Sequence, residues 1–139
     1  MFTRKSLGLD DAQAALDAIL GALSATDSPI ALAVVDEHGV PVLCLRQDGT
    51  PPRMLRRARA KAYTAANLGM DTVVFRDTAV KAASRTLEDW GDPMITALQG
   101  GLTIRSGGEV VGGIALSGNP TPRDQALARI GLDAMGITS

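Results

Sequence analysis

Three stretches of the chain place apolar residues three and four positions apart, as one face of an amphipathic helix does. They cover about residues 8–25, 53–68 and 123–135. Asp10 and Asp11 lie in the first turn of the first stretch, where the helix dipole favours negative charge, and Gly69 follows the second as a C-terminal cap. The pattern predicts three helices, and a less regular stretch at residues 76–89 predicts a further one.

Short apolar runs bounded by turn residues predict strands. They cover residues 30–35, 40–46, 101–105 and 109–117, and residues 94–98 are compatible with a short strand or a loop. Glycine-containing turns at 36–39 and 106–108 join neighbouring runs into antiparallel hairpins. Pro41 has no N–H for a partner strand, which places the second strand at a sheet edge. Hairpins separated by helices indicate an α+β fold, with a central antiparallel sheet of about five strands and helices packed on it.

The composition is that of a globular protein, with 45% hydrophobic and 21% charged residues. No linker, repeat or low-complexity tract divides the chain, so we expect one domain over residues 1–139. The net charge of −1 and an aromatic content of 3% argue against nucleic-acid partners. Because no apolar run approaches the length of a membrane span or forms a signal-peptide core, we expect a cytoplasmic protein without a membrane partner.

Metal chemistry has little support in the sequence. Cys44 is the only cysteine and His38 the only histidine. A dedicated transition-metal site needs several convergent nitrogen or sulfur ligands. We therefore predict no such metal site and no internal disulfide.

Lys61 interrupts the apolar face of the helix predicted over 53–68, between Ala58 and Ala65. One interpretation is that its amine extends to the edge of the buried surface. The other is that it projects into a pocket, where desolvation lowers its pKa and makes it a base or an anion anchor. Tyr63 lies off this face and is a candidate proton donor, ligand contact or interface residue.

Two further groups are candidates for ligand contact. Arg46 ends a predicted strand, and its guanidinium is suited to a carboxylate. Asp48 either joins that contact or pairs with Arg46 to fix the following turn. Gly100 and Gly101 lie at the start of another predicted strand, where glycine marks a close approach of backbone to a ligand or to a second subunit.

Four motifs in order resemble those of the GlcG/HbpS-like haem-binding family, which is related to the C-terminal domain of cobalamin-linked adenosyltransferases. The motifs are Ala31–Asp36 followed by a glycine turn, Arg46-Gln47-Asp48-Gly49, Lys61-Ala62-Tyr63-Thr64-Ala65, and Gly100-Gly101 with residues 108–118. The resemblance implies a profilin-like α+β domain, assembly into homo-oligomers, and haem binding as in some members.

The leading hypothesis is a small-molecule-binding protein that holds haem or another carboxylate-bearing ligand near Arg46 and Lys61. For haem, the iron ligand would come from a set in which no member stands out: His38, Cys44, Met54, Tyr63 and Met94. One alternative is an isomerase or lyase, with Lys61 or Tyr63 as the acid–base group and Arg46 as the carboxylate clamp. Another is a non-catalytic accessory protein that binds a partner.

Overall fold

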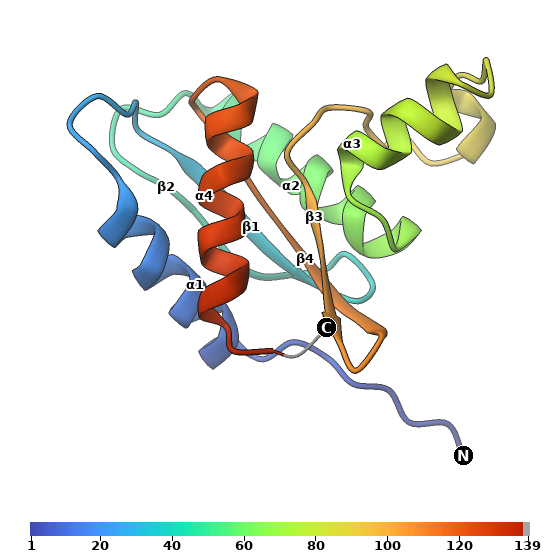
Figure 1. Cartoon of the computed structure of the whole chain (residues 1–139), viewed down its shortest axis with the longest axis horizontal. Coiled ribbons are helices and arrows are strands. Elements are labelled where there is room, and N and C mark those ends of the chain that lie inside the picture. The colour runs from blue at the N-terminus through green and yellow to red at the C-terminus, as the bar shows by residue number, and fades with distance from the viewer. Residues whose placement is uncertain (138–139) are drawn as a thin grey trace.

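An antiparallel sheet of four strands forms the centre of the structure, a computed structural model that describes residues 1–137 (Figure 1). The strands are β1 (Ala31–Asp36), β2 (Pro41–Arg46), β3 (Leu102–Ser106) and β4 (Glu109–Ser117). They lie in the order β2-β1-β4-β3, so both predicted hairpins form and β2 is an edge strand. The predicted α+β class is confirmed; residues 138–139 of the predicted domain lie outside the described residues.

The prediction of about five strands is wrong by one strand. Residues 94–98, the candidate fifth strand, form a turn and irregular backbone. The backbone N–H of Thr96 donates to Oγ1 of Thr64, 3.0 Å away, instead of to a neighbouring strand. A side chain of the facing helix therefore satisfies the amide that a strand would have used in the sheet.

Helices cover both faces of the sheet. α1 (Leu9–Ala22) and α4 (Thr121–Ala134) pack together on one face, and α2 (Pro52–Leu68) covers the other (Figure 1). These three helices match the predicted ones to within a few residues. Gly69 caps α2 in the left-handed conformation, and its N–H donates to the carbonyl of Ala65. Among the described residues, no helix is both long and apolar enough to cross a membrane.

The side chains of β1 alternate between two cores, which explains why its sequence is apolar at every position. Leu32 and Val34 pack towards α1 and α4, whereas Ala31, Ala33 and Val35 face α2. The surface of α2 on this side is also mainly alanine, so the helix approaches the sheet closely. A Cβ atom added at Gly113 of β4 would overlap the carbonyl oxygen of Ala62.

The helix predicted at residues 76–89 is only partly present. Its place is taken by α3 (Thr72–Val74), a π-helix η1 (Phe75–Lys81) and a short 3-10 helix η2 (Leu87–Trp90). Ser84 has a φ of +52°, which ends the regular helix before it reaches residue 89. Phe75 is buried and meets the Trp90 ring edge to face at 4.8 Å, and this contact anchors a segment that projects beyond the sheet (Figure 1).

Candidate functional site

A buried lysine borders a small pocket between α2, the end of β4 and the start of α4. Lys61 is only 2% exposed, and its Nζ donates a hydrogen bond to the carbonyl of Leu116. The pocket has a volume of about 80 Å³ and is lined by Met54, Arg57, Lys61, Ser117, Gly118, Asn119, Thr121 and Asp124. The amine of Lys61 is therefore directed into the protein and does not extend to solvent.

The packing of α2 explains why this lysine is buried. Ala58 lies three positions before Lys61, Ala62 follows it directly and Ala65 lies four positions after it, and all three alanines are fully buried. A side chain between them has no route to solvent along the helix surface. Sequence patterning placed Lys61 on this face, and the structure adds that a polar pocket receives the amine.

Gly100 and Gly101 lie directly against Lys61. A Cβ atom at Gly100 would lie 3.2 Å from Nζ, and one at Gly101 would overlap the lysine carbonyl oxygen. Gly100 also has a φ of +118°, a conformation that side-chain-bearing residues rarely adopt. The structure thus brings three of the six sequence-predicted site residues together.

Charged groups face Lys61 from two elements. Asp124, at the start of α4, is 3% exposed, and its Oδ1 accepts a hydrogen bond from the N–H of Asn119 at 3.2 Å. Arg57 is exposed, one turn before Lys61 on α2. Across residues 1–137, no Lys61–Asp124 ion pair shorter than 4.0 Å is present, so the two charges act on each other at longer range.

Burial controls the ionisation of both groups. Desolvation lowers the pKa of Lys61 to about 8, assisted by the positive charge of Arg57 and opposed by the negative charge of Asp124. Desolvation also raises the pKa of the Asp124 carboxyl, opposed first by Lys61 and then by hydrogen bonds from the backbone of Asn119 and Gly118. The pocket therefore holds an amine and a carboxylate whose ionisation is less favourable than in water.

Ser117 also lines the pocket, and its hydroxyl oxygen differs from the other buried polar atoms in its hydrogen bonding. Its Oγ is buried and has no hydrogen-bond partner, a property that no other buried side-chain atom of residues 1–137 shares. A buried hydroxyl without a partner costs about 1–3 kcal/mol. The pocket is thus a place where a polar group of a ligand finds an unused hydrogen-bonding group.

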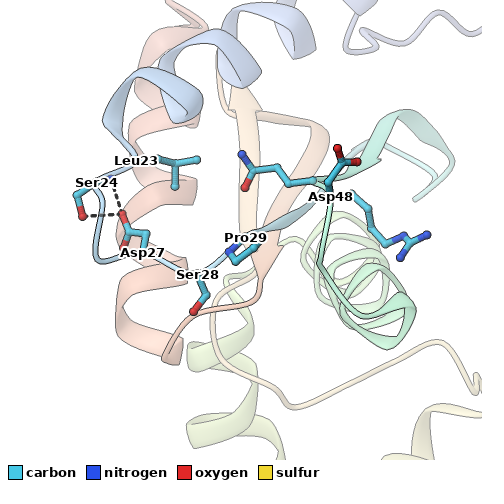
Figure 2. Close-up of a pocket in the computed structure, with 8 residues that line it drawn as sticks. Leu23, Ser24, Asp27, Ser28, Pro29 and Asp48 are labelled. Carbon is cyan, nitrogen blue, oxygen red and sulfur yellow. Dashed lines mark hydrogen bonds between the residues drawn. The ribbon is translucent and has the colours of Figure 1, made fainter.

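Asp48 lines a different hollow, which Figure 2 shows. Arg46 lines the same hollow. It is an open depression of about 650 Å³, lined by Leu23, Ser24, Asp27, Ser28, Pro29, Arg46, Gln47 and Asp48. Nη1 of Arg46 donates to the carbonyl of Thr50 at 2.7 Å. Of the ion pairs within residues 1–137, none joins Arg46 to Asp48, so Arg46 fixes the turn through the backbone instead.

The two hollows are separated by one strand. Arg46 of β2 pairs with Ala31 of β1, and Ala31 pairs with Ser117 of β4. Since neighbouring strands are about 4.8 Å apart, the backbones of Arg46 and Ser117 are roughly 10 Å apart. Neither Arg46 nor Asp48 lines the Lys61 pocket.

Tyr63 lies away from Lys61, because two positions along a helix correspond to a rotation of about 200°. Its hydroxyl donates to Oδ2 of Asp92 at 2.6 Å, and this hydrogen bond is the main reason why the pKa of Tyr63 is raised. Tyr63 does not line the Lys61 pocket. The hydroxyl proton of Tyr63 is therefore already used in a hydrogen bond to the Asp92 carboxylate.

The pocket residues that the sequence reasoning missed include Arg57, Ser117 and Asp124. Ser117 of β4 and Asp124 of α4 reach Lys61 only through the tertiary structure, whereas Arg57 lies one turn before Lys61 on α2. The polar run Ser117-Gly118-Asn119 at the end of a buried strand is a signal that could have indicated Ser117. Nothing in the spacing of Arg57 or Asp124 separates them from ordinary helix-surface charges.

An antiparallel sheet with helices on both faces and a lysine buried at one end defines this chain as an α+β protein with an internal polar pocket. The family model described as "Haem degrading protein HbpS-like" matches residues 7–133. The chain therefore belongs to the HbpS-like family, which confirms the resemblance of the four motifs. No curated protein sequence matches the chain significantly.

Solved structures share the fold over almost the whole chain. Protein ORFY of Klebsiella pneumoniae has 23% identity and a TM-score of 0.88, covering 100% of this chain and 97% of that one. A doubly substituted variant of HbpS from Streptomyces reticuli has 29% identity and a TM-score of 0.83, with coverages of 96% and 89%. A complex of PduOC with haem has 22% identity and a TM-score of 0.85, with coverages of 96% and 97%.

Proposed function

We propose that the protein binds a small molecule through a carboxylate group that enters the Lys61 pocket. Lys61 and Arg57 supply two positive charges and Asp124 one negative charge, so the fully ionised pocket carries a net charge of +1. One carboxylate neutralises it. The volume of about 80 Å³ corresponds to two or three water molecules at about 30 Å³ each, which suits a carboxylate and the atoms next to it.

The unpartnered Oγ of Ser117 is the observation that carries this proposal. A polar cluster that only stabilises the fold satisfies its members internally, because each buried orphan lowers stability. Lys61 and Asp124 each have a backbone partner, whereas Ser117 has none. A carboxylate oxygen of the ligand beside Lys61 would accept a hydrogen bond from the Ser117 hydroxyl and would pair with the positive charge of the amine.

Haem is a candidate ligand, since the family description names it. Its macrocycle is far larger than the Lys61 pocket, so only a propionate would enter and the ring would remain outside. Met54, in the pocket wall, is the one lining residue with a side chain that ligates haem iron elsewhere. The pocket therefore fits a propionate and does not fit an enclosed haem.

Arg46 is proposed as a second anion contact for a ligand that spans both hollows, with Asp48 beside it. The roughly 10 Å between the backbones of Arg46 and Ser117 leaves room for a molecule with two carboxylates, such as haem. The Gly100–Gly101 backbone would lie behind the Lys61 amine. We further propose that the protein acts as a homo-oligomer in the cytoplasm.

The enzymatic alternative depends on Lys61 and no longer on Tyr63. A lysine with a pKa of about 8 beside a buried carboxylate is suited to proton transfer or nucleophilic attack. Tyr63 is held by Asp92 and is distant from the pocket.

Binding measurements test the proposal directly. Propionate is titrated by calorimetry, and haemin by its Soret absorption, into the wild type and three variants. We expect Ser117→Ala to weaken binding about fivefold, because one hydrogen bond is worth about 1 kcal/mol, and Lys61→Met to weaken it further. Lys81→Met, the same change at an exposed lysine, should leave binding unchanged.

Two results would overturn the proposal. One is that neither propionate nor haemin binds the wild type. The other is that Ser117→Ala and Lys61→Met bind both ligands as the wild type does. Since Ser117 Oγ contributes no hydrogen bond to the fold, Ser117→Ala remains informative even if Lys61→Met is unstable. Arg46→Ala tests the second contact: it should weaken haemin and leave propionate unaffected.

A further inference from the structure

We infer that Lys61 forms a Schiff base with a small 2-oxo acid bound in its pocket. This inference rests on the proposed carboxylate site and names the class of substrate for it. It adds a covalent step that simple anion binding does not require. The support comes from the position of the amine, the placement of Arg57, and the presence of Asp124 and Ser117 in the lining of the same pocket.

The amine of Lys61 is held in a fixed position at the pocket. The carbonyl of Leu116 accepts one of its hydrogen bonds, and the backbone of Gly100 packs beside Nζ. A neutral amine is the nucleophile in imine formation, and desolvation favours the neutral form. With a pKa of about 8, about one-tenth of this lysine is neutral at pH 7.

Arg57 indicates which carbonyl compounds fit. It lies four residues before Lys61 on α2, so the two side chains are neighbours on one face of the helix. A carboxylate paired with the exposed guanidinium directs an adjacent carbonyl carbon inwards to the amine. In a 2-oxo acid these two groups are joined by a single bond. The small pocket volume favours acids of two to four carbons, such as pyruvate.

Asp124 and Ser117 supply the proton transfers. Because Lys61 and Asp124 are not in direct contact, a water molecule from solvent relays a proton from the Lys61 ammonium to the Asp124 carboxylate, and the neutral amine attacks the carbonyl carbon. The C–N bond forms as the C=O electron pair moves to oxygen, to which Ser117 Oγ donates a hydrogen bond. A proton then passes from nitrogen to that oxygen, giving a carbinolamine. Asp124 returns its proton to the hydroxyl, which leaves as water, and a protonated imine remains on Lys61.

Reductive trapping tests this step on the wild-type protein. Pyruvate and cyanoborohydride are added, and hydride transfer to the imine carbon converts it into a stable secondary amine. Peptide mass spectrometry then locates the adduct among Lys5, Lys61 and Lys81, the three lysines of the chain. We expect Lys61 to be modified at least about tenfold faster than the exposed Lys5 and Lys81, because neither of these is desolvated beside a carboxylate.

Variants and a larger acid sharpen the result. Arg57→Ala should slow trapping about tenfold, since the carboxylate loses its charged partner. The longer 2-oxoglutarate should be trapped more slowly than pyruvate. Lys61→Arg keeps the charge, removes the nucleophile, and should eliminate the fast adduct.

The outcomes separate this inference from the proposed function. If propionate binds in a Lys61-dependent manner but pyruvate gives no preferential adduct at Lys61, the Schiff base is overturned and the carboxylate site stands. Equal labelling of all three lysines also overturns it. If propionate does not bind and Lys61 is not trapped, both claims fail.

Discussion

At Lys61, burial and a nearby carboxylate act on the same amine in opposite directions. Desolvation is the larger effect, so the pKa of Lys61 falls to about 8 despite the charge of Asp124. A lysine that only stabilises the fold gains most from a direct ion pair with its acidic neighbour, which the described residues do not form here. The charged form of Lys61 is therefore buried at a cost in stability.

This cost predicts a pH dependence of stability. The pKa of Lys61 is about 8 in the folded protein against an ordinary 10.5, so the folded state releases the proton first as pH rises. The free energy of unfolding should therefore rise between these values, by about 2 kcal/mol from pH 7.5 to 9.5. Urea unfolding at several pH values measures this rise in the wild type and in Lys61→Met. The rise should be absent from the variant, which has no amine at this position. A pH-independent difference between the two proteins would show that the amine is not desolvated.

Gly100 predicts a second effect at the residue scale. Gly100→Ala places a side chain at a φ of +118° and a methyl group 3.2 Å from Nζ of Lys61. We expect a loss of about 3 kcal/mol in unfolding free energy and weaker propionate binding.

Gly91→Ala is the matched control for Gly100→Ala. Gly91 also has a positive φ, +63°, but a Cβ atom there would meet no atom within 4 Å. This variant should lose only about 1 kcal/mol and bind propionate normally. Equal effects of the two substitutions on binding would contradict the role given to Gly100.

At the scale of elements, the close approach of α2 to β4 positions the pocket. Small residues on both surfaces permit it, and Gly113 lies directly under the carbonyl of Ala62, next to Lys61 in the chain. Gly113→Ala should push the helix away and cost about 2–4 kcal/mol of unfolding free energy. Gly21→Ala, on the exposed side of α1, should instead add up to about 1 kcal/mol. Urea unfolding measures the stability of both variants. A Gly113→Ala variant as stable as the wild type would contradict the close packing of α2 on β4.

Local patterns were sufficient for most elements and for part of the site. Periodicity predicted the three long helices, both hairpins and the position of Lys61, because these depend on residues close in sequence. It failed at residues 94–98 and 76–89, where the side chain of Thr64 and the Phe75–Trp90 contact determine the backbone from a distance. The association of Ser117 and Asp124 with Lys61 depends on the tertiary fold in the same way.

At the scale of the whole molecule, both hollows open at one end of the sheet, where the α1–β1 connection and the start of α4 meet. Arg123 Nη2 pairs with Asp27 at 2.8 Å, and the side chain of Asn119 bonds the backbone of Ser28. These contacts fix the β4–α4 connection and the first turn of α4, which carries Asp124. The two hollows therefore lie at the same end of the sheet, as the proposed ligand that contacts both requires.

The proposed homo-oligomer is tested by the mass of the whole particle. Light scattering should give a multiple of the 14.4 kDa chain mass. β2 is an edge strand, and Val40 beside it is 56% exposed, so Val40→Lys should reduce that mass. Leu9→Lys, at a 61% exposed position on α1, serves as the control and should not change it. A wild type that has the mass of one chain at all concentrations would contradict assembly.

The central claim is that Lys61 is a desolvated amine that receives a ligand carboxylate. The most direct measurement is a pH titration of the lysine side chains by NMR on lysine-labelled protein, with and without propionate. Three lysines make the resonances separable, and Lys5 and Lys81 serve as internal references. We predict that Lys61 alone titrates near pH 8 and that propionate moves its pKa upwards, because a bound anion stabilises the ammonium. A Lys61 resonance that follows the same curve as Lys5 and Lys81, and that propionate leaves unchanged, would contradict the account.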